Sequence, residues 1–328
     1  KKNRKYYENT ASVANVALMW SQSTANNYSS SRQETDFTEE EDVGKSEVKG
    51  NYTESFQGFY EMLFRSQIPF DIITENKIDE EIPAHYQAIV LPNCACLNQE
   101  IINKLSHWVK NGGTLITTAD TFLHDENGKH RNDFPNDIVG MRWTGKYVNL
   151  PAGKSYLDMR EYSTNNEYFN NVRLSQEIML PVSGFAPVCE VISDSKVLAS
   201  LREPMAARYG EPTEIFAPAI GYQEFGKGAT LYFANAPGEI YHNYGINDYK
   251  KLISGFIRKN VSLPVTLKGI PDSLEVTWRY QEDNDRYLLH MINFTGSMRR
   301  PLTKIQEIFN IEIEVDLKNI KEIYTLEG

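Results

Sequence analysis

The 328-residue sequence has few cysteines, no long apolar run and no excess of basic side chains. Three cysteines are too few, and odd in number, for a disulfide framework, so a reducing, cytoplasmic compartment is expected. Because no apolar run approaches the roughly 20 residues that a membrane span needs, membrane insertion is not expected. The 34 basic and 44 acidic side chains give a formal charge of -10, which disfavours nucleic acid as a partner.

The start of the chain also lacks familiar features. The first residues, KKNRKYYENT, include neither an initiator methionine nor the apolar core of a signal peptide. This start is expected for a fragment of a longer protein or for a processed chain. The composition, with 41% hydrophobic and 24% charged residues, is ordinary for a globular protein, and the length fits two domains at roughly 150 residues each.

Apolar runs and amphipathic segments alternate over the first part of the chain. Two segments, ESFQGFYEMLFRSQ and QEIINKLSHWVKNGG, have apolar residues at helical spacing, and the second starts after Asn98 and ends at Gly112-Gly113. Apolar strands joined by such helices are typical of a parallel sheet covered on both faces, so a doubly wound α/β domain is predicted. The predicted strands are VANVALMW (13–20), PFDIIT (69–74), YQAIVLP (86–92) and TLITTAD (114–120).

Two stretches interrupt this pattern. Residues 21–50 are almost entirely polar and predict a loop of about thirty residues that is either functional or disordered. Residues from about 142 to 218 break into short runs with prolines and glycines, which predict short β elements inserted into the domain. The α/β pattern then returns with a hairpin turn at Gly226-Lys227-Gly228 and a closing helix in DYKKLISGFIRKN.

Beyond Pro264 the apolar residues alternate with polar ones. Segments such as SLEVTWRYQ and DRYLLHMINFTG read as strands of an antiparallel sheet. We therefore divide the chain into a larger domain over residues 10–263 and a small β-sandwich-like domain over residues 264–328. So few residues are left for a sandwich that this domain is either truncated or packed on the larger one.

The ordered set of these segments resembles the C-terminal half of family 42 β-galactosidases. In that family a catalytic (β/α)8 barrel is followed by a class I glutamine-amidotransferase-like, flavodoxin-like domain, called the trimerisation domain, and by a small β-sandwich. The resemblance implies the same fold here, a homo-oligomer, a catalytic barrel as partner, and a bacterial glycoside hydrolase as parent protein. The segments that carry it are VALMWSQSTANNY, GFYEMLFRSQIPFDII, YQAIVLPNCACLNQEIINKLSHWVKNGGTLITTADT, GKGATLYFANAP and RYLLHMINFTG.

The chain lacks the catalytic residues of active amidotransferases. In those enzymes a nucleophilic cysteine occupies a tight elbow after the strand that corresponds to TLITTADTF, but here residues 118–121 read Thr-Ala-Asp-Thr. The nearest candidates for a base and its orienting group, Glu239 and His242, occur in the reverse order and at a different spacing. No barrel repeat is present to hold a pair of glycosidase carboxylates. We expect that this chain is not catalytic alone and needs no cofactor.

Two of the three cysteines are close enough in sequence to suggest a metal or reactive site. Cys94 and Cys96 are one residue apart in the turn after a buried strand, but Cys189 is distant and has no histidine beside it. A Cys-x-Cys metal site needs two further ligands at a defined spacing. The pattern therefore favours small side chains packed under a loop, and no metal is expected.

Several polar and aromatic residues follow strand ends, where open α/β sheets form their ligand crevices. The loop ADTFLHDENGKHRND follows one strand, and the segment PGEIYHNYGINDY follows another. Substrate or subunit contact is one interpretation of these residues, while a solvated loop, core packing or helix capping are the alternatives. The candidate contact residues are Trp20, Tyr28, Asp120, Thr121, Asp125, His130, Tyr241 and His242.

Two alternatives to an accessory region remain open. The chain could be a stand-alone carbohydrate-binding protein or hydrolase that uses this crevice. A third hypothesis places a sugar platform in the small β domain, where Trp278 and Tyr280 are two apart on one strand and share a face, although packing against the larger domain is the competing explanation.

Overall fold

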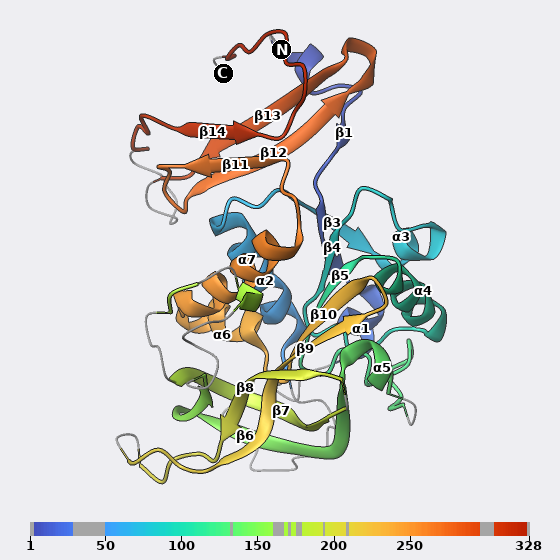
Figure 1. Cartoon of the computed structure of the whole chain (residues 1–328), viewed down its shortest axis with the longest axis vertical. Helices are drawn as coiled ribbons and strands as arrows, with labels where there is room; N and C mark the ends of the chain where they lie inside the picture. Colours follow the sequence, from blue (N-terminus) through green and yellow to red (C-terminus); the bar gives the residue numbers. More distant parts are fainter. Residues whose placement is uncertain are drawn as a thin grey trace, which may run out of the picture.

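The computed structural model describes residues 3–28, 50–131, 134–159, 167–169, 172–174, 179–192, 194–207, 210–295 and 305–326. Within these residues the strands form one mixed sheet of nine strands and two small sheets of three and two strands. Helices flank the large sheet, and the two small sheets lie together at one end of the molecule (Figure 1). The predicted α/β class with an additional small antiparallel part is confirmed.

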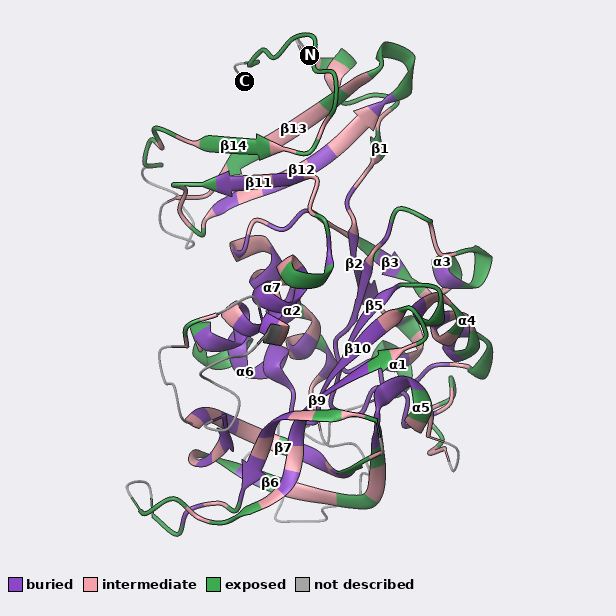
Figure 2. Ribbon diagram, viewed as in Figure 1, coloured by how far each residue is buried: buried purple, intermediate pink, exposed green. Residues whose placement is uncertain are grey.

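The predicted parallel strands form one half of the large sheet. They are β2 (Val16–Trp20), β3 (Phe70–Thr74), β4 (Ala88–Leu91), β5 (Thr114–Thr118) and β10 (Gly228–Phe233), in the spatial order β3-β2-β4-β5-β10. All four pairings are parallel. β4 and β5 are buried along their whole length (Figure 2), which explains why their sequences are continuous apolar or small-residue runs.

Four antiparallel strands extend the same sheet beyond β10. They are β9 (Ile215–Phe225), β8 (Lys196–Arg202), β6 (Met141–Asp158) and β7 (Met179–Val191), in that spatial order. The prediction of short elements was wrong for β6, which is 18 residues long. Its pairing with β7 shifts register twice, and Gly145 and Gly153, both with positive φ, lie in the shifted segments. Such irregularities interrupt the alternation that identifies one long strand in a sequence.

Helices cover both faces of the parallel half (Figure 1). α2 (Tyr52–Arg65), α6 (Pro237–Tyr244) and α7 (Asn247–Asn260) lie on one side, and α3 (Glu75–Glu80) and α4 (Gln99–Lys110) lie on the other. Asn98 caps α4 as predicted, because its Oδ1 accepts the Ile101 N–H at 2.8 Å. The shorter helices are α1 (Gln22–Asn27), α5 (Asn136–Val139) and the 3-10 turns η1 (Arg4–Tyr6), η2 (Glu167–Phe169) and η3 (Glu282–Asn284).

Helix α1 corrects the prediction of a continuous loop over residues 21–50. Ser21 caps this helix, since its Oγ accepts the Thr24 N–H at 3.0 Å. The carboxylate of Glu75 accepts the Gln22 and Ser23 N–H groups at 2.9 and 3.0 Å. A carboxylate at a helix N-terminus stabilises the helix, and this one comes from a distant part of the sequence. Residues 29–49 of the predicted loop lie outside the described residues.

The small sheets combine the two ends of the chain. β1 (Ala11–Ser12), β12 (Leu274–Gln281) and β13 (Arg286–Asn293) form one sheet, and β11 (Val265–Lys268) pairs with β14 (Glu312–Val315) in the other. The segment before β1 is also held there, because Arg279 donates to Thr10 Oγ1 at 2.7 Å. The small sheet therefore contains residues 11–12 as well as residues from beyond 264, and the domain division at residue 264 stays a prediction.

Trp278 packs in the core of the small sheets with Val265, Leu267 and Val276. Only 4% of its surface is exposed. Trp278 therefore cannot offer a ring face to a sugar in this structure, so the predicted platform of Trp278 and Tyr280 is not formed. The alternative prediction, packing against the larger domain, is also wrong, because Trp278 packs with residues of the small sheets.

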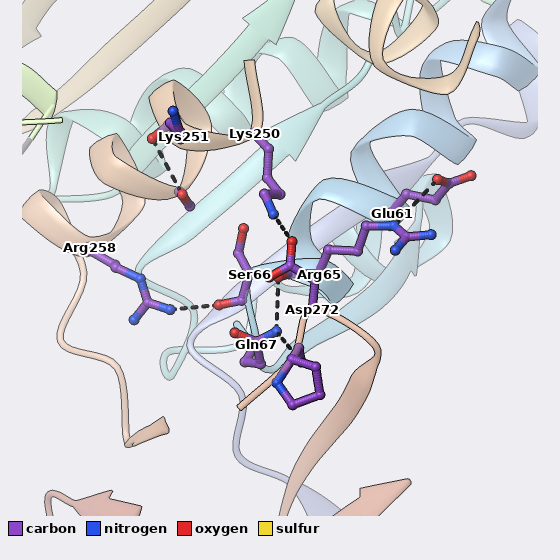
Figure 3. A network of polar contacts seen from close by, with 10 residues as sticks. Glu61, Arg65, Ser66, Gln67, Lys250, Lys251, Arg258 and Asp272 are labelled. Carbon is purple, nitrogen blue, oxygen red and sulfur yellow. Dashed lines mark hydrogen bonds and ion pairs between the residues drawn. The ribbon is translucent and has the colours of Figure 1, made fainter. Parts of the chain in front are cut away.

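A polar network joins the small sheets to the helices of the large sheet (Figure 3). Lys250 of α7 pairs with Asp272, which precedes β12. Arg258 donates to the Ser66 carbonyl at 2.6 Å, and Gln67 donates to the Pro271 carbonyl at 3.5 Å. Contacts from α7 and from the turn after α2 thus fix the chain just before β12. Among the described residues, no helix is long and apolar enough to cross a membrane.

Candidate functional site

The carboxyl ends of the parallel strands bring several predicted residues to one edge of the sheet. β2 leads into Ser21, β4 into Asn93 and β5 into Asp120. The backbone of these turns is tied together, because the Asn93 N–H donates to Thr118 Oγ1 at 2.9 Å and the Asp120 N–H donates to Asn93 Oδ1 at 3.0 Å. This edge is the expected place for a crevice in an open α/β sheet.

The turn after β5 has the backbone of a tight elbow. Ala119 has a φ of 49°, in the left-handed region that non-glycine residues rarely occupy. Its N–H donates to the Phe233 carbonyl at 2.7 Å, and its carbonyl accepts the Tyr232 hydroxyl at 2.9 Å. Thr121 is fully buried, and its hydroxyl donates to the Thr118 carbonyl at 2.7 Å. The side chain at the elbow is therefore a methyl group, which cannot act as a nucleophile.

Asp120 and Tyr28 form a buried pair next to this elbow. The Tyr28 hydroxyl donates to Asp120 Oδ2 at 2.7 Å and accepts the Gly50 N–H at 3.1 Å. Burial raises the pKa of Tyr28 well above its usual value, and the Asp120 carboxylate raises it further. Asp120 is 1% exposed and Tyr28 is 4% exposed. The structure thus brings together two predicted residues but seals them from solvent.

The cysteine turn after β4 is also closed. Cys94 and Cys96 are both fully buried, and the Cys96 N–H donates to Thr24 Oγ1 at 3.0 Å. Burial, with Asp125 as the next largest contribution, raises the pKa of the Cys96 thiol to about 12, and burial raises that of Cys94 as well. A thiol that remains protonated at neutral pH is a poor nucleophile and a poor metal ligand. No cluster of three metal-ligating side chains occurs among the described residues.

The loop after the elbow, together with Trp143 and Tyr147 of β6, forms the more exposed part of this edge, which we call the rim. Asp125 is half-buried and closes its own loop, because its Oδ1 accepts the Asn127 and Lys129 N–H groups at 3.0 and 2.9 Å. His130 is half-buried and lies 4.8 Å from the Trp143 ring, between centroids, and Trp143 lies 5.7 Å from Tyr147. The rim therefore presents partly exposed rings beside a carboxylate. Asp133 lies outside the described residues.

The remaining predicted residues pack elsewhere. The Trp20 ring lies 4.9 Å from the Phe56 ring in an edge-to-face contact, which agrees with the core-packing alternative. Tyr241 is buried, and its neighbour His242 lies with Nδ1 3.3 Å from Glu61 Oε1 of α2. These two residues of α6 are thus held against α2, and their assignment as contact residues stays a prediction.

Two glutamates complete this edge: Glu239, named above only as a candidate for a catalytic base or its orienting group, and Glu75, which the sequence does not single out. Glu239 of α6 accepts the Asn51 N–H at 3.1 Å and so lies next to Gly50, which donates to Tyr28. Glu75 binds the N-terminus of α1, where its Oε1 accepts the Ser21 hydroxyl at 2.7 Å. The position of Glu239 in the first turn of a helix that begins with Pro237 was a usable signal. Nothing local to Glu75 indicates its role.

The chain is similar to a known domain family over part of its length. Residues 14–156 match the family model described as the beta-galactosidase trimerisation domain. The resemblance to this accessory region of family 42 β-galactosidases is therefore confirmed for these residues. No curated protein sequence matches the chain.

Solved structures share the fold at low sequence identity. The β-galactosidase from Bacillus circulans sp. alkalophilus has a TM-score of 0.59 and 19% identity over 84% of this chain and 35% of its own. The α-L-fucosidase isoenzyme 2 from Paenibacillus thiaminolyticus has a TM-score of 0.68 and 17% identity over 96% of this chain and 44% of its own. The β-galactosidase from Rahnella sp. R3 has a TM-score of 0.61 and 14% identity over 93% and 41%. The chain thus spans less than half the length of these proteins.

Proposed function

We propose that the chain is the accessory, assembly-forming region of a β-galactosidase-like glycoside hydrolase and has no catalytic machinery of its own. The match of residues 14–156 to the trimerisation domain carries this proposal. The methyl side chain of Ala119 at the elbow and the protonated, buried thiols of the cysteine turn support it. In this proposal the partners are further copies of the chain and a catalytic barrel, within a cytoplasmic bacterial protein.

The strand order supports a flavodoxin-like, amidotransferase-like architecture. Numbered by their own order in the chain, the five parallel strands follow the spatial order 2-1-3-4-5, which is that of flavodoxin-like sheets. Ligands of such sheets bind at the switch point, which here lies between the ends of β2 and β4. In this chain Ser21, Thr24 and Cys96 fill that point with mutual hydrogen bonds. A filled switch point favours a structural role over cofactor binding.

The rim is the part of the site that we assign to contact with a neighbouring subunit or its substrate. Asp125 and His130 are partly exposed, and His130 is next to the ring of Trp143. Aromatic rings with a polar tip are common in interfaces because they bury a large area at a low entropy cost. The other predicted residues of this edge are buried and are assigned a structural role instead; they are Asp120, Thr121 and Tyr28.

The mass of the chain in solution tests the assembly role. Light scattering during size-exclusion chromatography, over a concentration series, should show a stable trimer or dimer. Trp143→Ala should weaken this assembly, whereas Tyr244→Ala, which removes an exposed ring from α6, should not. A monomer at every concentration would contradict assembly through this chain.

Hydrolysis assays test the absence of catalysis. The chain should not turn over aryl galactosides or other aryl glycosides. Turnover that is abolished by Asp120→Asn, in a variant that still folds, would overturn the non-catalytic part of the proposal. It would favour a stand-alone hydrolase that uses the crevice at the end of β5.

A further inference from the structure

A groove of about 250 Å³ lies between the large sheet and the small sheets. One wall consists of residues from the end of α2 and from β3, and the other consists of residues from β12. β3 is the terminal strand of the large sheet, so the groove runs beside an edge that no other strand of this sheet covers. The contacts of Figure 3 hold the two walls together, and Gln67 belongs to both the network and the groove.

Aromatic rings form the apolar wall of the groove. Tyr60 and Phe70 meet edge to face, with ring centroids 5.3 Å apart and an interplanar angle of 82°. Phe64 stacks parallel to Tyr60 with centroids 6.4 Å apart. All three rings line the groove. Aromatic faces carry a partial negative charge and attract cations that approach within about 6 Å of the ring centre.

Two carboxylates complete the lining. Asp71 of β3 and Glu275 of β12 come from opposite walls, and no lysine, arginine or histidine lines the groove. Within the described part of the chain neither carboxylate forms an ion pair, although Asp71 accepts the Tyr86 hydroxyl at 2.9 Å. Partial burial raises the pKa of Tyr60, and the charge of Glu275 raises it further, which agrees with a carboxylate close to this ring. The groove thus has negative charge without its own counter-charge.

We propose that this groove binds an organic cation, an alkylammonium or guanidinium group, against Tyr60, with Asp71 and Glu275 of its lining as the counter-charges. The volume fits one such group with a short alkyl chain. A neutral sugar could also stack on the rings, but it would leave the negative charge of the lining without compensation. The inference is independent of the proposed assembly role, because the groove is formed by a single chain.

Two sources of this cation are distinguishable. A free small amine would need only the rings and carboxylates. An arginine or lysine side chain of an extended peptide would also gain backbone hydrogen bonds along the open edge of β3. Choline and ethylguanidinium therefore represent the free cation, and the peptide acetyl-Ala-Arg-Ala-amide represents the second source.

Titration calorimetry of the whole chain tests the proposal. Each cation should bind at least about tenfold more tightly than its neutral counterpart, 3,3-dimethylbutan-1-ol for choline and ethylurea for ethylguanidinium, and binding should weaken as salt is raised. Tighter binding of the peptide than of ethylguanidinium would identify a peptide side chain as the source, and equal binding would identify a free cation.

Matched variants locate the site. Glu275→Gln should weaken cation binding by about fivefold or more, whereas Glu282→Gln, which removes an exposed charge from the same small domain, should leave it unchanged. Tyr60→Leu should weaken binding and Tyr60→Phe should retain it, because only the first removes the ring. Equal binding of cations and neutral counterparts, preference for galactose over every cation, or equal effects of the two glutamate substitutions would overturn the proposal.

Discussion

The contact between α2 and α6 makes a quantitative prediction for Gly58. This residue lies in the interior of α2, and a Cβ atom placed on it would lie 1.8 Å from the Gly238 carbonyl oxygen, where ordinary contacts begin at 3.4 Å. The obstructing atoms all belong to the backbone of Gly238, so a change of rotamer cannot relieve the clash. The two helices approach this closely because both have glycine at the crossing point.

Two effects of Gly58→Ala oppose each other. Alanine is favoured over glycine in a helix interior by about 1 kcal/mol. Overpacking a well-packed contact costs about 3 kcal/mol when side chains cannot yield, since the helices must separate. The separation would also disturb the contact between Glu239 and Asn51, which lies at the start of α2. We therefore expect a net loss of about 2 kcal/mol in the free energy of unfolding.

Urea denaturation followed by circular dichroism measures this loss. Gln57→Ala, at the exposed neighbouring position of the same helix, serves as the control and should change the free energy of unfolding by less than about 0.5 kcal/mol. A Gly58→Ala variant that is more stable than the parent by about 1 kcal/mol, as helix propensity alone requires, would refute the close approach of α2 and α6.

Four further outcomes follow from buried polar groups. Tyr28→Phe should cost about 2 kcal/mol in urea denaturation, because it removes the hydroxyl that donates to Asp120 and accepts the Gly50 N–H; an unchanged midpoint would contradict this. Arg202→Leu should cost about 3 to 5 kcal/mol, since it breaks a buried ion pair with Asp158 that measures 2.5 Å, whereas a cost below about 1 kcal/mol would show that the pair is dispensable. The three buried cysteines should not react with a thiol reagent at pH 8 until the chain unfolds. Burial raises the pKa values of Cys96 and Cys189 to about 12 in the folded state, so the protonated thiols stabilise the fold fully below the unfolded pKa of about 8.5. This stabilisation should be lost as the pH rises toward about 12. A free energy of unfolding that stays constant over that range would contradict the raised pKa values.

The strands of the parallel half were predictable because burial on both faces removes polar residues from them. β2 and β4 read as apolar runs for this reason, and Asn98 identified the start of α4 because its capping contact is local. Helix α1 was missed because part of what stabilises it, the Glu75 carboxylate, lies 54 residues from Ser21. Long-range partners of this kind leave no mark on the local pattern.

The positions of candidate site residues along the sequence were predictable, but their burial was not. Asp120 was predictable because it ends the predicted strand 114–120, and the position of a strand end follows from the apolar pattern; the observed strand β5 ends two residues earlier, at Thr118. Asn93 also follows a strand, and its φ of 53° is the left-handed conformation that asparagine tolerates. It was overlooked in favour of the neighbouring cysteines. The burial of Asp120 beneath Tyr28 depends on tertiary packing, which no single segment specifies.

The pairing of β1 with β12 has a consequence for synthesis of the chain. Thr10 and its partner Arg279 are 269 residues apart, so the ribosome makes nearly the whole chain between them. At typical elongation rates this interval is on the order of half a minute. During that time the large sheet can fold while the β1 strand, although made first, has no partner. The small sheet therefore closes only after β12 is made, and a nascent chain that stops before residue 274 should carry an unpaired segment over residues 10–12 that is accessible to proteases.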